Sequence, residues 1–213
     1  MLRREGWRDN HKRIYRLYSE QGLSLRLKRP RRNKSAQRRQ PQPQGLYPNH
    51  VWGMDFVSDA LFDGRRLRLL TVIDLYTREC LGICVGHNLR STEVAEMLNT
   101  IALRRPLPEL LKTDNGSEFA GKMLDKWVYE RGIRIDFSRP GTPTDNATVE
   151  SFNGRMRQGG LNENWFMCLE NARCKIEAWR IHYNQKCPHS ALGWMTLSEF
   201  AEKSTGCRNM QPT

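Results

Sequence analysis

The chain has 213 residues, of which 38% are hydrophobic and 27% are charged, enough apolar content for one core of ordinary size plus a small appendage. Its N-terminus is charged and no stretch approaches the roughly 18 apolar residues of a membrane span, so we expect a cytoplasmic protein that is neither exported nor held in a membrane. Six cysteines form no C-x-x-C pair, which argues against a zinc site.

The net charge of +12 is carried almost entirely by the first 50 residues. They contain 14 Lys or Arg and 3 Asp or Glu, whereas residues 51–213 contain 21 Lys or Arg and 20 Asp or Glu. Concentrated positive charge attracts a polyanion through counterion release, which gives affinity without sequence preference. The alternative is a solvated, disordered tail. The pattern therefore favours nucleic-acid binding by this basic arm.

Within the arm, residues 10–22 predict a short basic amphipathic helix that carries Lys12, Arg13 and Arg16 and ends at Gly22. Residues 29–44 are rich in Arg, Gln, Lys and Pro, and they include Arg31 and Arg32. This stretch has too little apolar surface to fold alone, so we interpret it as a linker.

The sequence changes character at residue 51, where three short apolar runs begin. Residues 51–59, 67–75 and 79–86 are separated by charged, turn-like steps, which predicts an antiparallel meander. Ser91 is a suitable N-cap for a helix that ends before Pro106. A strand at 109–113, a helix at 117–131, a strand at 133–137 and a helix from near Asp145 follow. Leu169, Ala172, Ile176, Trp179 and Tyr183 then repeat at helical spacing. This order predicts an α/β layer on a mixed five-stranded sheet.

Three carboxylates stand in positions that suggest chemistry. Asp55 interrupts an apolar strand, where an unpaired charge costs several kcal/mol and therefore demands a partner or a cation. Asp114 ends the strand at 109–113, at the edge of the sheet where functional crevices lie. Glu150 lies about one turn into the helix from Asp145, with 35 residues between it and Asp114. Oxygen donors of this kind suit Mg²⁺, and two such ions can catalyse in-line phosphoryl displacement. Any one of these acids alone could equally form an ion pair or a cap.

The segments around these acids resemble the DDE core of the retroviral integrase superfamily. They are WGMD (52–55), DNGSEF (114–119) and DNATVESFN (145–153). The chain is more closely similar to the OrfB transposases of the insertion-sequence family whose OrfA and OrfB frames overlap. That similarity includes HKRIYRLY (11–18), RIHYN (180–184), PHSALG (188–193) and EFA (199–201).

The resemblance implies an RNase H-like fold and a DDE transposase that uses Mg²⁺ or Mn²⁺, with two ions expected. Asp55, Asp114 and Glu150 would be both catalytic residues and metal ligands. The substrates would be the terminal inverted repeats of the element and target DNA, with an OrfA or OrfAB partner and a homo-multimer on the nucleoid. We expect residues 1–28 to be the remnant of a helix-turn-helix domain, 29–48 a basic linker, 49–160 the catalytic core and 161–213 its helical extension.

On the helix that carries Glu150, the residues Asn146, Asn153 and Arg157 share its polar face. The family resemblance implies a DNA contact for Arg157, seven residues after the glutamate, and we group Asn153 and Asn146 with it. The alternatives are a solvated helix face and, for Asn146, a plain helix residue. With Lys12, Arg13, Arg16, Arg31 and Arg32 these residues are the predicted DNA-binding set. Asp74 matches a family position, and we expect it to form a fold-stabilising pair with an arginine.

Three features depart from the family pattern. The chain begins inside the expected helix-turn-helix, Cys187 replaces an arginine before Pro188, and Gly159-Gly160 follows Arg157 and should break or bend the helix. The alternative to an enzyme is therefore a catalytically silent, truncated derivative that binds DNA and assembles with, or inhibits, a full-length transposase. An RNase H-type nuclease would share the fold, but the 35-residue spacing and the C-terminal segments argue against it.

Overall fold

The computed structural model describes residues 6, 10–23, 45–114, 116, 119, 121–138 and 147–208, with side chains to residue 205. The chain divides into two compact units, Met1–Pro41 and Gln42–Thr213. Among the described residues, no helix has the length and apolar character needed to cross a membrane.

In the first unit, helix α1 covers His11–Glu20. Its N-cap is Asn10, whose side chain accepts a hydrogen bond from the Lys12 N–H at 3.0 Å. The helix ends as predicted before Gly22, which adopts a left-handed φ of 67° that favours glycine. None of its residues is buried, so α1 has no core of its own.

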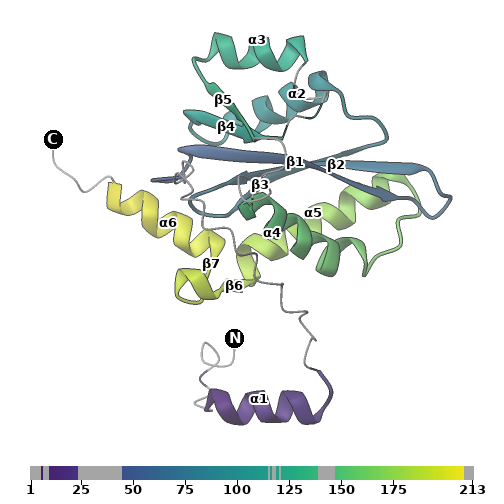
Figure 1. Ribbon diagram of the computed structural model, residues 1–213, viewed down its shortest axis with the longest axis vertical. Helices are drawn as coiled ribbons and strands as arrows, with labels where there is room; N and C mark the ends of the chain where they lie inside the picture. Colours follow the sequence, from purple (N-terminus) through teal and green to yellow (C-terminus); the bar gives the residue numbers. More distant parts are fainter. Residues whose placement is uncertain are drawn as a thin grey trace, which may run out of the picture. The chain divides into compact units, whose positions relative to one another are not determined.

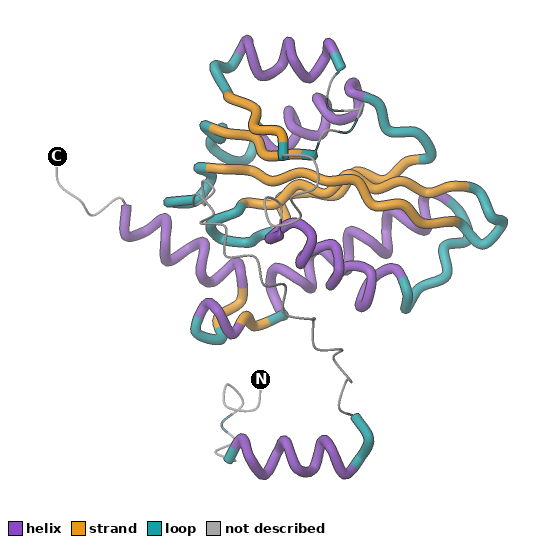
Figure 2. The backbone as a smooth tube through the Cα atoms, viewed as in Figure 1, coloured by secondary structure: helices purple, strands orange, loops and turns teal. Residues whose placement is uncertain are grey.

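The second unit is built on a five-stranded sheet in the order β3-β2-β1-β4-β5 (Figures 1 and 2). Strands β1 (Val51–Ala60), β2 (Arg66–Asp74) and β3 (Cys80–Gly86) form the predicted antiparallel meander. Strand β4 (Leu110–Thr113) is parallel to β1, and β5 (Arg134–Phe137) is parallel to β4. The prediction of a mixed five-stranded sheet is confirmed.

Helices cover both faces of this sheet (Figure 1). Helices α2 (Ser91–Ala102) and α3 (Lys122–Glu130) lie on one face, and α4 (Ala147–Met156) and α5 (Leu169–Lys186) lie on the other. Because side chains alternate along a strand, β2 sends Leu70 and Val72 to the α2–α3 core and Leu69 and Ile73 to the α4–α5 core. A strand buried on both faces explains the continuous apolar run that the sequence shows there.

Two predicted boundaries move. Helix α3 begins at Lys122 rather than at residue 117. Ser91 is the first residue of α2 and not its cap, since the N-cap is Arg90, whose N–H donates to the Glu93 carboxylate at 2.9 Å. The shift at α2 is one residue and lies within the usual uncertainty of helix ends, whereas the shift of five residues at α3 exceeds it.

Helix α4 approaches the sheet closely because β1 has a glycine beneath it. A Cβ built on Gly53 would lie 2.6 Å from a methyl group of Val149 and 2.8 Å from one of Leu75. Helix α5 packs beside α4 through the predicted seam, in which Ala172, Ile176 and Tyr183 are buried. The glycine therefore fixes the distance between α4 and the strand that carries Asp55.

The chain ends in a small hairpin and a last helix. Strand β6 (Pro188–His189) pairs with β7 (Met195–Thr196) after a short 3-10 turn (Ser190–Leu192), and α6 (Leu197–Arg208) follows. Thr196 and Glu199 form a reciprocal capping box at the start of α6. The Glu199 N–H donates to the Thr196 hydroxyl at 3.3 Å, and the Thr196 N–H donates to the Glu199 carboxylate at 2.8 Å. Leu197 is fully buried in the α4–α5 core, so this extension is part of the same packed unit.

Candidate active site

Asp55 lies in the middle of β1, the central strand of the sheet, and Thr71 of β2 is its antiparallel partner. On the other side of β1, the parallel register pairs Val51 with Leu110 and Gly53 with Lys112. Continued by two residues, this register places Asp114 beside Asp55. Neighbouring strands are about 4.8 Å apart, so the first two predicted acids meet at the end of β4.

Burial and neighbouring charge raise the pKa of Asp55 from 3.8 to about 6. The largest cause is the loss of water around the carboxylate, and the negative charges of Asp114 and Glu150 add to it. Hydrogen bonds from the Phe56 N–H, at 2.7 Å, and from the Asn153 amide, at 2.8 Å, act in the opposite direction. The two other predicted acids therefore act electrostatically on Asp55.

Asp114 and Glu150 are exposed, while Asp55 is half-buried. Asp114 follows β4 directly and accepts the Gly116 N–H at 3.1 Å, and Glu150 lies in the first turn of α4. Within the described ranges, no three Asp, Glu, His or Cys side chains already stand close enough together to hold a metal ion. The donor set nevertheless fits a hard divalent cation. Three carboxylates supply only oxygen ligands, and a cation among them would offset both the burial of the Asp55 charge and its repulsion by the other two acids.

Asn153 positions the Asp55 carboxylate. It is only 7% exposed, and its amide N–H₂ donates to Asp55 while its carbonyl oxygen accepts from the Thr71 hydroxyl at 3.1 Å. The Thr71 hydroxyl also lies 3.2 Å from the Asp55 carbonyl oxygen. The structure thus gives Asn153 contacts within the protein, and the DNA contact expected of it stays a prediction.

Arg157 follows α4 and begins a π-helix (Arg157–Leu161) that contains the glycine pair. Its exposed guanidinium donates to the Ser58 carbonyl oxygen at 3.3 Å. The Arg157 side chain therefore contacts β1, the strand that carries Asp55. The predicted break in the helix is confirmed, and it has a packing reason. A Cβ on Gly160 would lie 3.3 Å from the Trp179 ring of α5, so glycine lets this turn pass close to the indole.

The other predicted DNA contacts divide into two groups. Lys12, Arg13 and Arg16 are exposed on α1, where Arg16 lies 3.5 Å from Glu20. Asn146, Arg31 and Arg32 lie outside the described residues.

The expectation that Asp74 pairs with an arginine is wrong. Its buried carboxylate accepts hydrogen bonds from the N–H groups of Asn49 and Tyr76 and from the Thr77 hydroxyl, at 2.9–3.0 Å. Glu79, five residues further along the chain, is the acid that pairs with an arginine, since Arg105 donates two hydrogen bonds to its carboxylate. Backbone donors in the turn after β2 suit the carboxylate better than a long cation, because they are already fixed at hydrogen-bond distance.

Sequence reasoning missed Thr71 and Gly53 as parts of the site. Thr71 is a polar residue in the apolar strand opposite Asp55, and Gly53 is a glycine inside a strand, which often marks close backbone approach. Both signals were present, but only the register and the position of α4 reveal their partners.

The fold is that of retroviral integrase catalytic cores. The catalytic core domain of HTLV-2 integrase in complex with magnesium superposes with a TM-score of 0.59 at 21% identity, covering 74% of this chain and 99% of that one. A chain of the simian T-cell lymphotropic virus intasome in complex with PP2A regulatory subunit B56 gamma gives a TM-score of 0.66 at 20% identity, covering 78% and 60%. At such identities the likeness defines the RNase H-like fold alone.

Sequence comparison defines the family. Two profiles with the description "Integrase core domain" match residues 46–143 and 131–196. The chain is 46% identical, over 95% of its length and 73% of the relative's, to an uncharacterized 31.7 kDa protein of insertion element IS407 from Burkholderia multivorans. It is 43% identical to an uncharacterized 39.2 kDa protein of insertion element IS476 from Xanthomonas euvesicatoria, over 94% of this chain and 58% of that protein. The chain belongs to the integrase-core family of insertion-sequence DDE transposases.

A more distant relative carries the transposase name itself. The putative transposase InsK of insertion sequence element IS150 from Escherichia coli is 27% identical over 95% of this chain and 75% of the relative. The chain spans between 58% and 75% of the length of these three proteins.

Proposed function

We propose that this chain is a metal-dependent polynucleotidyl transferase that cuts DNA at the ends of its insertion sequence and joins the freed 3′-hydroxyl to another strand. The observation that carries the proposal is the electrostatic action of Asp114 and Glu150 on Asp55. The three acids come from a strand end, a helix and a strand, respectively. A phosphodiester carries negative charge, so three bare carboxylates would repel it, whereas the same carboxylates holding a cation would attract it.

Asp55, Asp114 and Glu150 would hold Mg²⁺ or Mn²⁺, and two ions are the expected number. When bound, such ions lower the pKa of an attacking oxygen and neutralise charge on the leaving oxygen. The protein's own contribution is position. Asn153 fixes the orientation of the Asp55 carboxylate through its 2.8 Å hydrogen bond. The N–H₂ and the carbonyl oxygen of the Asn153 side chain both form hydrogen bonds, so this side chain is itself held in place. The Asp55 carboxylate that it contacts therefore loses little rotational freedom on binding a cation.

Arg157 would hold the phosphodiester next to the acids. Its guanidinium reaches the backbone of β1, is exposed and matches a family position that contacts DNA. The basic arm, with Lys12, Arg13 and Arg16 on α1, would add affinity without sequence preference. Recognition of the terminal inverted repeats is assigned to an OrfA or OrfAB partner, and joining two ends requires a multimer that acts on DNA in the cytoplasm.

The test uses the purified full chain with two DNA substrates and Mg²⁺. The first is a duplex that carries the terminal inverted repeat flanking the coding sequence. The second is a branched duplex that mimics the joined product, because the reverse reaction passes through the same transition state and needs no recognition of the element's end. We expect a metal-dependent product on at least the branched substrate.

The deciding variant is Asp114→Asn, with Asp125→Asn as the matched control. Asp125 is an exposed aspartate on α3, on the other face of the sheet from α4, so the control removes the same charge at a distance (Figure 1). Absence of activity in the wild type would identify the chain as the catalytically silent derivative. Activity that survives Asp114→Asn would reject the proposed catalytic site.

A further inference from the structure

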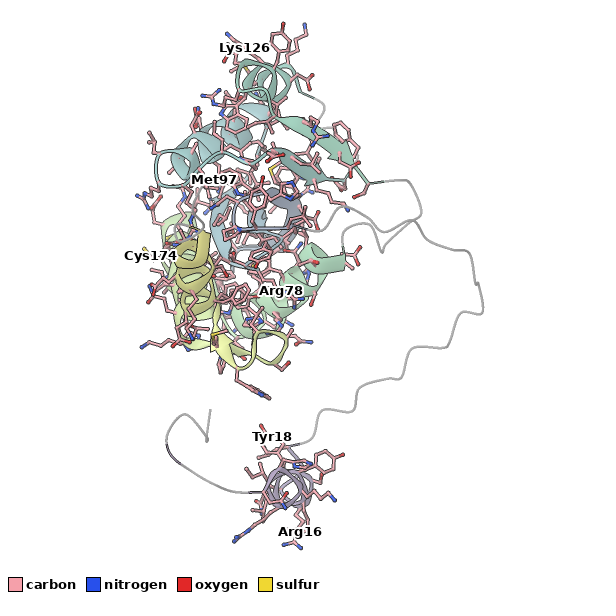
Figure 3. All side chains as sticks on the ribbon, turned by 90° about the vertical axis from the view of Figure 1, so that its left-hand side faces the viewer. Arg16, Tyr18, Arg78, Met97, Lys126 and Cys174 are labelled. Carbon is pink, nitrogen blue, oxygen red and sulfur yellow. The ribbon has the colours of Figure 1, made fainter. Side chains whose placement is uncertain are left out.

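A second polar pocket lies beside α4, away from the acids. It has a volume of about 190 Å³ and is formed by four segments of the second unit. Arg78 contributes from the turn after β2, Thr148, Ser151 and Arg155 from α4, Tyr183 from α5 and His189 from β6. Arg78 is labelled in Figure 3, where it lies beside α4.

The rim of this pocket is cationic. Arg78 and Arg155 are both exposed, and within the described part of the chain neither forms a salt bridge. Arg78 adopts a left-handed φ of 63°, an uncommon conformation for a residue with a Cβ. Other arginines of this unit have an acidic partner, as Arg105 has Glu79 and Arg180 has Glu177. The two rim arginines therefore leave their positive charge available for a ligand.

The floor contains a buried imidazole with an unused hydrogen-bonding atom. His189 is only 4% exposed, and its Nε2 has no hydrogen-bond partner among the described residues. Its ring packs edge-on against Tyr183, with centroids 5.4 Å apart. Burial, and then the positive charges of Arg155 and Arg78, lower the pKa of His189 to about 4, so the ring is neutral near pH 7. A neutral ring with N–H at Nε2 would donate into the pocket, and orphaned buried groups of this kind call for an explanation.

Helix α4 adds hydroxyl donors and its positive end. Thr148, Ser151 and Arg155 follow one another at spacings of three and four residues and so share one helix face. The first-turn residues Ala147 and Thr148 also line the pocket, where the N–H groups of a helix have no partner within it and the helix dipole is positive. At about 100° per residue, this face is rotated by more than a quarter of a turn from that of Glu150.

We propose that Arg78, Arg155, Ser151 and His189 form a binding site for a backbone phosphate of DNA, separate from the acidic site. The inference rests on the proposed function in that DNA is taken to be the polyanion. The site would hold a phosphodiester on one face of α4 while Glu150 acts on the other. Two guanidinium groups and two short donors match the two non-bridging oxygens of one phosphate.

The rest of the floor favours a DNA phosphodiester over a free phosphate ion. The buried side chains of Ile73, Phe152 and Tyr183 add apolar surface to a lining that also contains polar groups. Such surface suits the carbon atoms of a deoxyribose attached to the phosphate, whereas a fully hydrated small ion gains nothing from it. The proposed contact reads no base, so it would bind DNA of any sequence.

The first experiment measures binding of a random-sequence duplex by the full chain, in EDTA and across a range of salt concentrations. The variant is Arg78→Ala/Arg155→Ala, and the matched control is Lys122→Ala/Lys126→Ala on α3. Both lysines are exposed, and Lys126 lies at the far end of the unit from Arg78 in Figure 3. We expect the variant to lower affinity on the order of tenfold near 0.1 M salt and to reduce the slope of log K against log salt by about 0.9, the value for one lost phosphate contact. Equal behaviour of variant and control would overturn the proposal.

The second experiment identifies the source of the phosphate. The imidazole nitrogen signals of His189 are followed by NMR and assigned with His189→Gln, while the random-sequence duplex or inorganic phosphate is added. We expect the duplex to shift the Nε2 signal in the wild type and in the lysine control but not in the arginine variant. A shift with inorganic phosphate alone would show a site for the free ion and reject the DNA contact. Neither experiment uses metal or cleavage. The phosphate site can therefore be tested even if the proposed catalytic activity is absent.

Discussion

The two polar faces of α4 have opposite chemistry. One carries Glu150 towards Asp55 and Asp114, where negative charge accumulates and a cation is needed. The other carries Arg155 and Ser151 towards Arg78 and His189, where positive charge and an unused donor accumulate and an anion is needed. A single helix packed on the sheet thus separates a region of negative charge from a region of positive charge.

This difference shows why the C-terminal extension belongs to the functional unit. The acidic face is completed by β1, β4 and α4 alone, whereas the cationic pocket also requires Tyr183 of α5 and His189 of β6. Their rings are buried against the same core as Phe152. The extension therefore supplies both packing and ligand groups.

The largest expected effect comes from the acidic face. Glu150→Gln should lower strand transfer by on the order of a thousandfold, because a lost carboxylate removes several kcal/mol of charge stabilisation at about 1.4 kcal/mol per factor of ten. Binding of random duplex in EDTA should be unchanged or tighter. Glu150→Gln should slow the chemical step, whereas Arg155→Ala should weaken DNA binding. Single-turnover rates at saturating DNA should be measured for both variants, and an equal loss of rate in both would contradict the separation of the two faces.

Asp55→Asn should stabilise the metal-free protein while it abolishes activity. The pKa of Asp55 is raised from 3.8 to about 6 by burial and by the neighbouring acids. The protonated form therefore stabilises the fold below pH 4, and that contribution is lost as pH rises through 6. At pH 8 the variant should gain at most about 3 kcal/mol over the wild type, and less because the carboxylate is partly exposed.

Urea denaturation at pH 8 and near pH 4 checks this prediction, with Asp125→Asn as the control for lost charge. The difference between Asp55→Asn and the wild type should be present at pH 8 and vanish near pH 4. Added Mg²⁺ should stabilise the wild type and the Asp125→Asn control but not Asp55→Asn. A pH-independent difference would mean that the hydrogen bonds, rather than the charge of Asp55, govern stability there.

Asn153→Ala should weaken metal binding by about 10- to 100-fold, the usual cost of losing a group that orients a metal ligand. The variant frees the Asp55 carboxylate from its 2.8 Å hydrogen bond without removing a ligand. Activity should therefore recover at high Mg²⁺ concentration, which a structural defect would not allow. The Mg²⁺ dependence of strand transfer is the measurement. Thr71→Val removes the hydroxyl contacts to Asn153 and to the Asp55 carbonyl oxygen but keeps the hydrogen bond from Asn153 to the Asp55 carboxylate, so it should show a smaller shift.

The smallest effect is expected from Gly53→Ala, which acts on both faces together. The added methyl group would lie 2.6 Å from the stiff Val149 side chain, so α4 must shift, at a cost of about 1–2 kcal/mol. Stability from urea denaturation, strand transfer and duplex binding should all fall modestly. Val149→Ala in the same chain should restore part of each loss, and additive losses would count against the packing explanation.

Much of the fold followed from local patterns. The strands at 51–59, 67–75 and 79–86, the turn-forming steps between them and the helical seam from Leu169 to Tyr183 were read from spacing alone, and each is present. The start of α3 was missed by five residues, because helix ends depend on caps that several residues can supply.

The site divides in the same way. Asp55 could be singled out because an acid inside an apolar strand is costly, and Glu150 because its segment resembles a known family. The hydrogen-bond partners of Asp74 could not be predicted, because backbone N–H groups leave no signature in a sequence. The pocket of Arg78 and His189 joins residues 111 positions apart and had no local signal.

The sequence by itself predicted the five strands and most of the helices, the family and three candidate acids, because alternation, helical spacing and characteristic segments are local properties of the chain. Only the tertiary structure decided which residues face one another. It brought Asn153 to Asp55 and Arg155 to His189, since the register of β1 and the seating of α4 on Gly53 depend on packing across the whole sheet.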